Sequence, residues 1–155
     1  MKKLILILLL SASTYAQQQL SVGIDVRNAI VGSEPTQNES ATDWTFQYKA
    51  RQNHLEMGLS VETFKKINYF DYNLFAGYYT GETVVFYGNI GFGQIVRESN
   101  VGTFNYESNV GIDYYFLDNF GASYELNFNR RMDLKYLYGV DKPILSNTIK
   151  IIYKW

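Results

Sequence analysis

The chain has 155 residues, no cysteine and a formal net charge of −1. A length of this order indicates one domain. The lack of cysteine excludes disulfides, thiolate metal ligands and a cysteine nucleophile, and the near-neutral charge argues against a nucleic-acid binder, which needs a basic surface. Aromatic residues make up 17% of the chain, 14 of them tyrosines, and that excess needs a structural explanation.

The first sixteen residues have the organisation of a secretory signal peptide. Lys2 and Lys3 give a positive start, residues 4–10 are an unbroken apolar run, and the tripeptide 14–16 ends in Ala16 as signal peptidase prefers. The apolar run is about a third of the ~20 residues that a membrane-spanning helix needs. The sequence therefore predicts a signal peptide over residues 1–16, cleaved after Ala16, and a single domain over residues 17–155.

Beyond this segment, apolar and polar residues alternate, which is typical of strands with two different faces. A helix would need apolar residues three and four positions apart, and these segments do not keep that spacing. The expected strands, eight in number, are 20–27, 44–51, 55–62, 70–79, 84–92, 104–116, 120–129 and 148–155. Their lengths bracket the about 9–11 residues with which a tilted strand crosses a hydrocarbon layer.

The connections between these strands alternate in length. Tight turns are expected near 52–53, 80–82 and 117–119, whereas longer loops are expected over 28–42, 94–102 and 130–145, with a shorter one around 65–66. Short turns at one end and longer loops at the other are the pattern of outer-membrane barrels, and both termini fall on the short-turn side, which is then periplasmic. Pro35 and Pro143 lie in long loops, where a missing N–H disturbs no strand pairing.

The aromatic residues of the apolar face are sorted by height. One set falls near the long-loop ends and another near the short-turn ends, with aliphatic residues between them. The two sets are Trp44, Phe70, Phe92, Phe104 and Phe128, and Tyr78, Tyr114, Phe116, Phe120, Tyr153 and Trp155. Two lipid–water interfaces select such girdles, so the apolar face is expected to meet lipid and the polar face a narrow lumen.

The last strand ends on Trp155, with Tyr153 two positions before it. This resembles the final strand of outer-membrane barrels, and the resemblance implies that Tyr153 and Trp155 form the signal read by the barrel-assembly machinery. Strand number, girdles and terminus together resemble the small outer-membrane proteins of the OmpA transmembrane-domain and OmpX type. The resemblance implies an all-β, eight-stranded antiparallel up-and-down transmembrane β-barrel. The expected partners are outer-membrane lipid and lipopolysaccharide, and the expected state is a monomer.

Charged residues on the polar face are expected to pair inside the lumen, because buried charges must be paired. Lys150 is expected to bridge Glu125 and Asp25 across the closing seam of the barrel. Lys49 and Arg51 are expected to lie beside Glu56 and Asp25. One interpretation of this set is a structural polar core, and the other is a gate in which exchanging partners opens a narrow path.

The sequence offers no catalytic pair, metal-ligand spacing or cofactor motif. His54 is the one histidine, and it falls in a predicted periplasmic turn, away from the extracellular rim where outer-membrane deacylases and proteases keep their catalytic groups. The expected role is therefore non-enzymatic, either structural in the envelope or in surface interaction through the extracellular loops.

The last long loop carries a basic cluster of Arg130, Arg131, Lys135 and Lys142. The cluster either meets lipopolysaccharide phosphates or an acidic partner, or is simply solvated. Two alternatives remain open for the protein as a whole. One is a narrow pore for ions or small solutes. The other is a soluble periplasmic lipid-binding barrel with its faces reversed.

Overall fold

The computed structural model describes residues 16–31, 42–64, 69–97 and 100–155. Apart from Ala16, the predicted signal peptide lies outside these residues. The elements in chain order are β1 (Gln17–Asp25), α2 (Val26–Val31), β2 (Trp44–Gln52), β3 (Leu55–Phe64), β4 (Tyr69–Thr80), β5 (Val84–Arg97), β6 (Asn100–Tyr115), β7 (Phe120–Arg131), α3 (Met132–Tyr138) and β8 (Ile144–Lys154). No helix within the described ranges is long and apolar enough to span a membrane.

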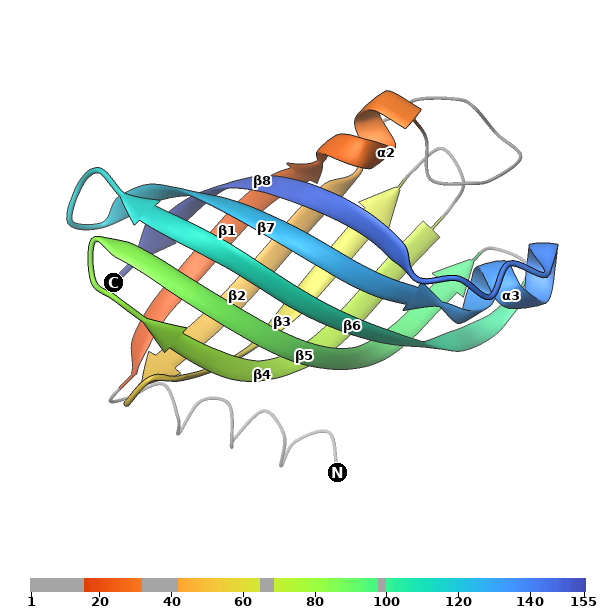
Figure 1. Cartoon of the computed structure of the whole chain (residues 1–155), viewed down its shortest axis with the longest axis horizontal. Helices are drawn as coiled ribbons and strands as arrows, with labels where there is room; N and C mark the ends of the chain where they lie inside the picture. Colours follow the sequence, from red (N-terminus) through yellow and green to blue (C-terminus); the bar gives the residue numbers. More distant parts are fainter. Residues whose placement is uncertain (1–15, 32–41, 65–68, 98–99) are drawn as a thin grey trace.

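The strands close into one barrel (Figure 1). Each strand pairs antiparallel with the next, and β8 returns to β1, with Val22 opposite Ile151 and Gly23 opposite Lys150. The predicted eight-stranded up-and-down β-barrel is therefore confirmed. Because β1 and β8 pair with each other, each of the eight strands has a hydrogen-bonded neighbour on both sides. A sheet that spans lipid has to be closed in this way, since the unpaired backbone groups of an open edge cannot be satisfied there.

The two faces of the wall are opposite in chemistry. Side chains buried inside the barrel are mostly polar or charged, whereas large apolar side chains on the outside expose from 37% (Leu59) to 74% (Ile90) of their surface. This is the expected orientation of the faces. The alternative with reversed faces, a soluble barrel with an apolar interior, is wrong.

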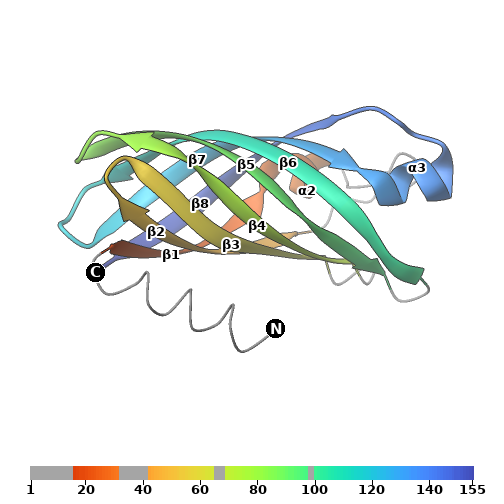
Figure 2. The ribbon, with the colours of Figure 1, turned by 90° about the horizontal axis from the view of Figure 1, so that it is seen from below.

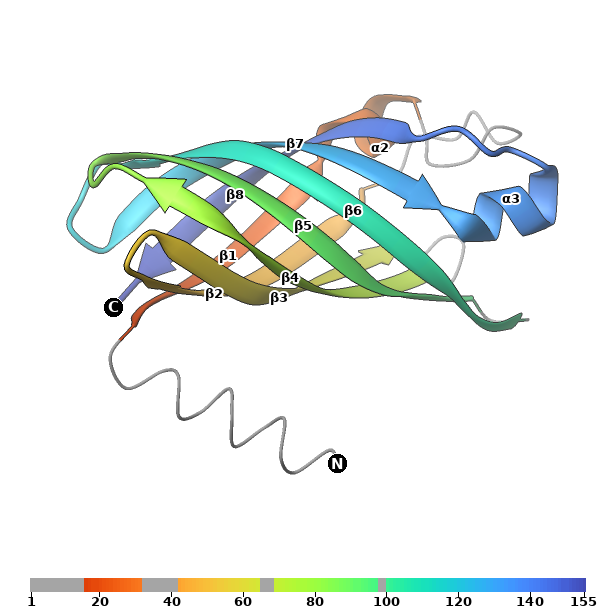
Figure 3. The ribbon, with the colours of Figure 1, turned by 60° about the horizontal axis from the view of Figure 1, so that its bottom comes forward.

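The two ends of the barrel differ, as Figures 2 and 3 show. The short turns and the carboxyl terminus lie at one end, and α2 and α3 lie at the other. These ends are called here the turn end and the loop end. Within the turn end, Val85, Tyr115 and Ile152 form a small buried apolar cluster. In the β2–β3 turn, Asn53 and His54 take positive φ angles of 51° and 69°, the backbone that a two-residue hairpin with the favoured twist requires.

The loop end corrects several predicted boundaries. β5 runs to Arg97 and β6 begins at Asn100, so most of the predicted loop 94–102 is strand. Val26 starts α2 instead of continuing β1. The last loop contains α3, which stops at Gly139 because this residue takes a left-handed φ of 68°.

Candidate functional site

The polar lumen is the candidate site, and its turn-end half is organised around Arg51. The guanidinium donates from Nε to Glu56 Oε2 at 2.7 Å and from Nη2 to Asp113 Oδ2 at 2.8 Å. Its Nη1 donates to Gln19 Oε1 at 2.9 Å, and the Tyr115 hydroxyl donates to the same Gln19 oxygen at 2.8 Å. One buried cation therefore ties β2 to its neighbours β1 and β3 and to β6 across the lumen.

A second network is centred on Lys150. Its Nζ donates to Glu125 Oε1 at 2.5 Å and to Gln47 Oε1 at 3.0 Å. The other Glu125 oxygen accepts a hydrogen bond from the Tyr87 hydroxyl at 2.8 Å. Because these residues come from β8, β7, β2 and β5, the network crosses the lumen between facing walls.

Lys49 lies between the two networks and is held more loosely than either cation. Its Nζ is 3.7 Å from Glu56 Oε1 and 3.4 Å from the centroid of the Tyr87 ring. Among the described residues it has no hydrogen-bond acceptor, although its side chain is 1% exposed. A charge–π contact and a long ion pair thus hold this ammonium in place.

The predicted lumen set is brought together except at Asp25. The pairs Lys49–Glu56, Arg51–Glu56 and Lys150–Glu125 form, whereas Asp25 accepts a hydrogen bond from the Asn28 backbone N–H at 2.8 Å, at the start of α2. The predicted bridge from Lys150 to Asp25 is therefore wrong. The reason is register, because Lys150 lies opposite Gly23, while Asp25 lies opposite Thr148, nearer the loop end.

Sequence reasoning missed five members of the networks, namely Gln19, Gln47, Tyr87, Asp113 and Tyr115. All five are buried inside the barrel. Nothing in the local pattern shows that Asp113 on β6 would meet Arg51 on β2, because these strands are not neighbours. The two tyrosines read as part of the aromatic excess, but their hydroxyls complete hydrogen bonds in the lumen.

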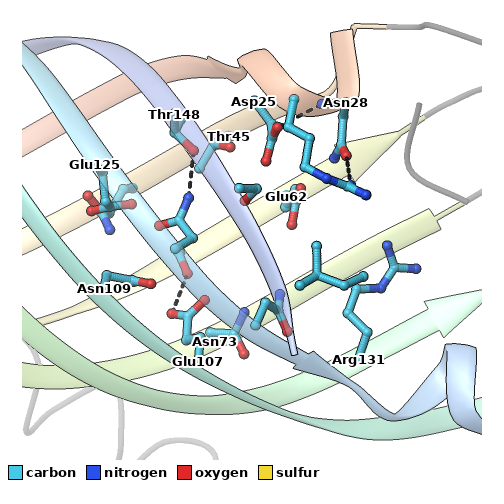
Figure 4. Close-up of a pocket in the computed structure, with 17 residues that line it drawn as sticks. Asp25, Asn28, Thr45, Glu62, Asn73, Glu107, Asn109, Glu125, Arg131 and Thr148 are labelled. Carbon is cyan, nitrogen blue, oxygen red and sulfur yellow. Dashed lines mark hydrogen bonds between the residues drawn. The ribbon is translucent and has the colours of Figure 1, made fainter. Parts of the chain in front are cut away.

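A polar cavity of about 40 Å³ occupies the loop-end half of the lumen (Figure 4). Its lining includes Asp25, Glu62, Asn73, Glu107, Asn109 and Arg131. Each internal water needs roughly 10–15 Å³ of such volume, so the cavity has room for a few waters, well below the ~300 Å³ at which small-molecule pockets begin. Asn109 Oδ1, which has no partner among the described residues, is a natural acceptor for one of these waters.

A cluster of two arginines on one aspartate fixes α3 at the loop end. Arg131 donates to both Asp133 oxygens, at 3.0 and 2.6 Å, and Arg97 donates to Asp133 Oδ2 at 3.0 and 2.8 Å. Leu134 next to this cluster is fully buried. Burial raises the pKa of Asp133, but the hydrogen bonds and charges of Arg131 and Arg97 outweigh it and hold that pKa below its usual range.

Replacing Asp133 with asparagine is expected to lower the free energy of unfolding at neutral pH by about 2 kcal/mol, because two buried guanidinium groups lose a charged acceptor. A carboxyl group with a depressed folded pKa contributes stability above its unfolded pKa of about 3.9, and this contribution is lost as pH falls through the folded pKa. Urea midpoints of the two proteins should therefore converge in acid. The exposed Asp141→Asn variant is the control and should show no comparable gap. A gap for Asp133→Asn that does not narrow at all as the pH falls below about 3.9 would contradict the assignment.

The predicted basic cluster of the last loop is divided by the structure. Arg131 faces the lumen and is buried, so its expected exposure is wrong. Arg130 and Lys135 are exposed and share Asp141, each at 2.8 Å. Hydrogen bonds from Lys135 and Arg130 lower the pKa of Asp141. Lys142 is exposed as well, so three of the four predicted basic side chains lie at the surface, and two of them share one carboxylate.

His54 and the carboxyl-terminal aromatics lie at the turn end. The His54 ring is exposed and stacks on Tyr78 with centroids 5.6 Å apart. Tyr153 packs against Phe120 at 4.8 Å and stacks on Trp155 at 5.8 Å, all on the outer face. Within the residues that the structure describes, no group of three or more histidine or acidic side chains converges as a metal site would.

Comparison with known proteins gives the fold. No family model and no curated protein matches the chain. The N-terminal β-barrel domain of Pseudomonas aeruginosa OprF matches 90% of this chain and 97% of its own length, with a TM-score of 0.64 and 14% identity. A designed transmembrane β-barrel matches 90% of this chain and 95% of its own, with a TM-score of 0.59 and 14% identity. The outer membrane protein Ail of Yersinia pestis matches 90% and 99%, with a TM-score of 0.56 and 13% identity. The chain therefore has the fold of the small outer-membrane β-barrels, and identities this low carry the fold alone.

Proposed function

We propose that this protein is a non-enzymatic, integral outer-membrane β-barrel whose lumen is a structural polar core and whose interactions take place at the loop end. The observation that supports the membrane placement is that polar side chains are buried and large apolar side chains are exposed, the reverse of a water-soluble protein. The charged networks are inside, and the exterior is a continuous apolar band from β1 to β8. A water-exposed protein rarely presents an apolar surface of that extent, whereas a bilayer requires it.

The aromatic contacts on the outer face support the same placement. At the turn end, Phe120, Tyr153 and Trp155 pack in sequence. On the loop-end side of the apolar band, Phe92 stacks on Phe104, which in turn meets Tyr106 edge-on at 4.7 Å. Aromatic rings at both ends of an aliphatic band match the two interfaces of a membrane. Contact of the turn-end aromatics with the barrel-assembly machinery during biogenesis is part of this proposal.

The loop end offers a rigid platform for surface interaction. The Asp133 cluster and buried Leu134 fix α3, which then presents Lys135, Tyr136 and Leu137 to the outside. Tyrosine and leucine beside basic side chains suit a partner with both apolar and anionic parts. Lipopolysaccharide phosphates are the proposed anionic partner of Arg130 and Lys135, and the barrel is proposed to act as a monomer.

A narrow pore is the second candidate, and the loose position of Lys49 favours it. Its ammonium is close enough to Glu56 and Tyr87 to exchange partners without a large movement. Conduction would still require breaking the Arg51 or Lys150 network, both of which cross the lumen. Buried pairs with short, direct hydrogen bonds are more simply explained as packing.

The test is to express the full chain in a Gram-negative host, fractionate the cells and record the purified protein in a planar bilayer. The proposed function predicts recovery from the outer-membrane fraction, a mobility difference between boiled and unboiled samples, and an electrically silent bilayer. Release with the periplasmic contents would contradict the membrane placement. Discrete openings that change in Lys49→Met would replace the structural lumen with the pore.

A further inference from the structure

The outer wall of β4, β5 and β6 carries an apolar groove. An open depression of about 840 Å³ at mid-height and another of about 480 Å³ nearer the loop end share Leu74, Phe92 and Phe104. The β4–β6 groove is defined by Tyr72, Leu74, Ala76, Ile90, Phe92 and Phe104. It therefore runs continuously from the middle of the apolar band to its loop-end rim, across β4, β5 and β6.

Register and ring contacts explain the shape of the groove. Small Ala76 lies opposite Ile90, and the next row toward the loop end joins Leu74, Phe92 and Tyr106. Phe92 and Phe104 stack with centroids 6.3 Å apart, and Phe104 meets Tyr106 edge-on. These three rings form one side of the groove, and the small side chain of Ala76 leaves space between them and the strand backbone. An apolar depression with one stiff aromatic wall has the chemistry that suits an acyl chain.

The loop-end rim of the groove changes from apolar to polar and basic. The Tyr72 hydroxyl donates a hydrogen bond to the Gln94 side-chain carbonyl there. Arg130 on β7 lies directly opposite Tyr106, on the same outer face, and shares Asp141 with Lys135. Two cations meet one carboxylate at this rim, which leaves a local excess of positive charge above an apolar groove.

We propose that the β4–β6 groove and the adjacent Arg130 and Lys135 form a binding site for one lipopolysaccharide molecule, with an acyl chain in the groove and a phosphate at the two basic side chains. This rests on the proposed outer-membrane placement, with the loop end toward the outer leaflet. Lipopolysaccharide has apolar acyl chains and, toward the outside, anionic phosphates. The site has an apolar groove and, toward the loop end, two basic side chains. The acyl chain gains packing contacts with the groove wall, and the phosphate contact gives the headgroup selectivity.

The test is a native mass-spectrometric titration of the protein, purified from membranes in detergent, with lipopolysaccharide, its dephosphorylated form and phosphatidylglycerol. Ala76→Phe fills the groove, and Ala122→Phe makes the same change at an exposed outer position of β7, away from it. Arg130→Ala combined with Lys135→Ala removes the basic rim, and Lys142→Ala removes a neighbouring exposed charge as its control.

Saturable binding of one lipopolysaccharide is expected, and Ala76→Phe should weaken it about tenfold, because the ring takes the place of part of the acyl chain and its packing contacts are lost. Ala122→Phe should bind as the unmodified protein does. The double basic variant should lose its preference for the phosphorylated form, and Lys142→Ala should keep it. Equal binding by Ala76→Phe and Ala122→Phe, equal competition by phosphatidylglycerol, or a dimer in place of the lipid complex would each overturn the proposal. Failure of the protein to reach the outer-membrane fraction is a separate result, because it would refute the proposed function before any lipid is added.

Discussion

Replacing Arg51 with alanine is expected to lower the free energy of unfolding by about 3–5 kcal/mol, the largest effect of any single substitution in the lumen. The guanidinium bonds directly to Glu56 and Asp113 and its side chain is 1% exposed. Its removal leaves two buried carboxylates without the cation that is hydrogen-bonded to both. Lys49 is too far from Glu56 to replace the lost hydrogen bond. The measurement is the urea midpoint of the boiled-versus-unboiled mobility difference in detergent micelles.

Two further variants separate the buried charge from a general loss of an arginine. Arg130→Ala removes an exposed guanidinium that is paired with Asp141, and exposed pairs of this kind contribute little. If Arg51→Ala does not fold, adding Glu56→Gln and Asp113→Asn should restore folding, because the stranded charges are then gone. A midpoint for Arg51→Ala equal to that of Arg130→Ala would show that the network does not stabilise the barrel.

The fold could be predicted from the sequence because every strand of such a barrel has one face toward lipid and one toward a polar lumen, so its residues alternate between apolar and polar. Outward residues such as Leu74 and Val110 alternate with inward Asn73 and Asn109, and that period survives without any knowledge of strand pairing. The predicted end of β5 was wrong because one residue interrupts the alternation of outward apolar and inward polar side chains. Ile95 is apolar yet points inward and is 1% exposed, so β5 read as ending before it.

The lumen pairs were harder to predict from the sequence, because they depend on the position of each residue along the barrel axis and on contacts across the lumen. Counting from strand ends placed Lys150 level with Asp25, but strands in a closed barrel are staggered by its shear, and Lys150 lies opposite Gly23. The contact between Arg51 and Asp113 joins strands that are not neighbours, so no pairwise strand pattern contains it. The carboxylates that pair with the loop-end arginines were present in sequence, but their geometry depends on α3, which the sequence pattern did not reveal.

The pair formed by Lys150 and Glu125 gives the second large prediction. Lys150→Met leaves a fully buried carboxylate, and Glu125→Gln leaves a fully buried ammonium, so each should lower the free energy of unfolding by about 3 kcal/mol. The double variant should cost less than the sum of the two by about 1–3 kcal/mol, since residues in one network are coupled. The measurement is a double-mutant cycle on urea midpoints at neutral pH.

The cycle also bears on the role of the lumen. The direct 2.5 Å contact between Lys150 and Glu125 must be broken before an ion passes through the lumen. A large coupling energy between these two residues therefore predicts that the bilayer recording is electrically silent. Gln47 and Tyr87 supply the remaining hydrogen bonds to the pair, and their loss in either single variant adds to its cost. Additive single costs, with no coupling term, would mean that Lys150 and Glu125 are each satisfied by other groups, and the lumen would then be open to exchange of partners around Lys49.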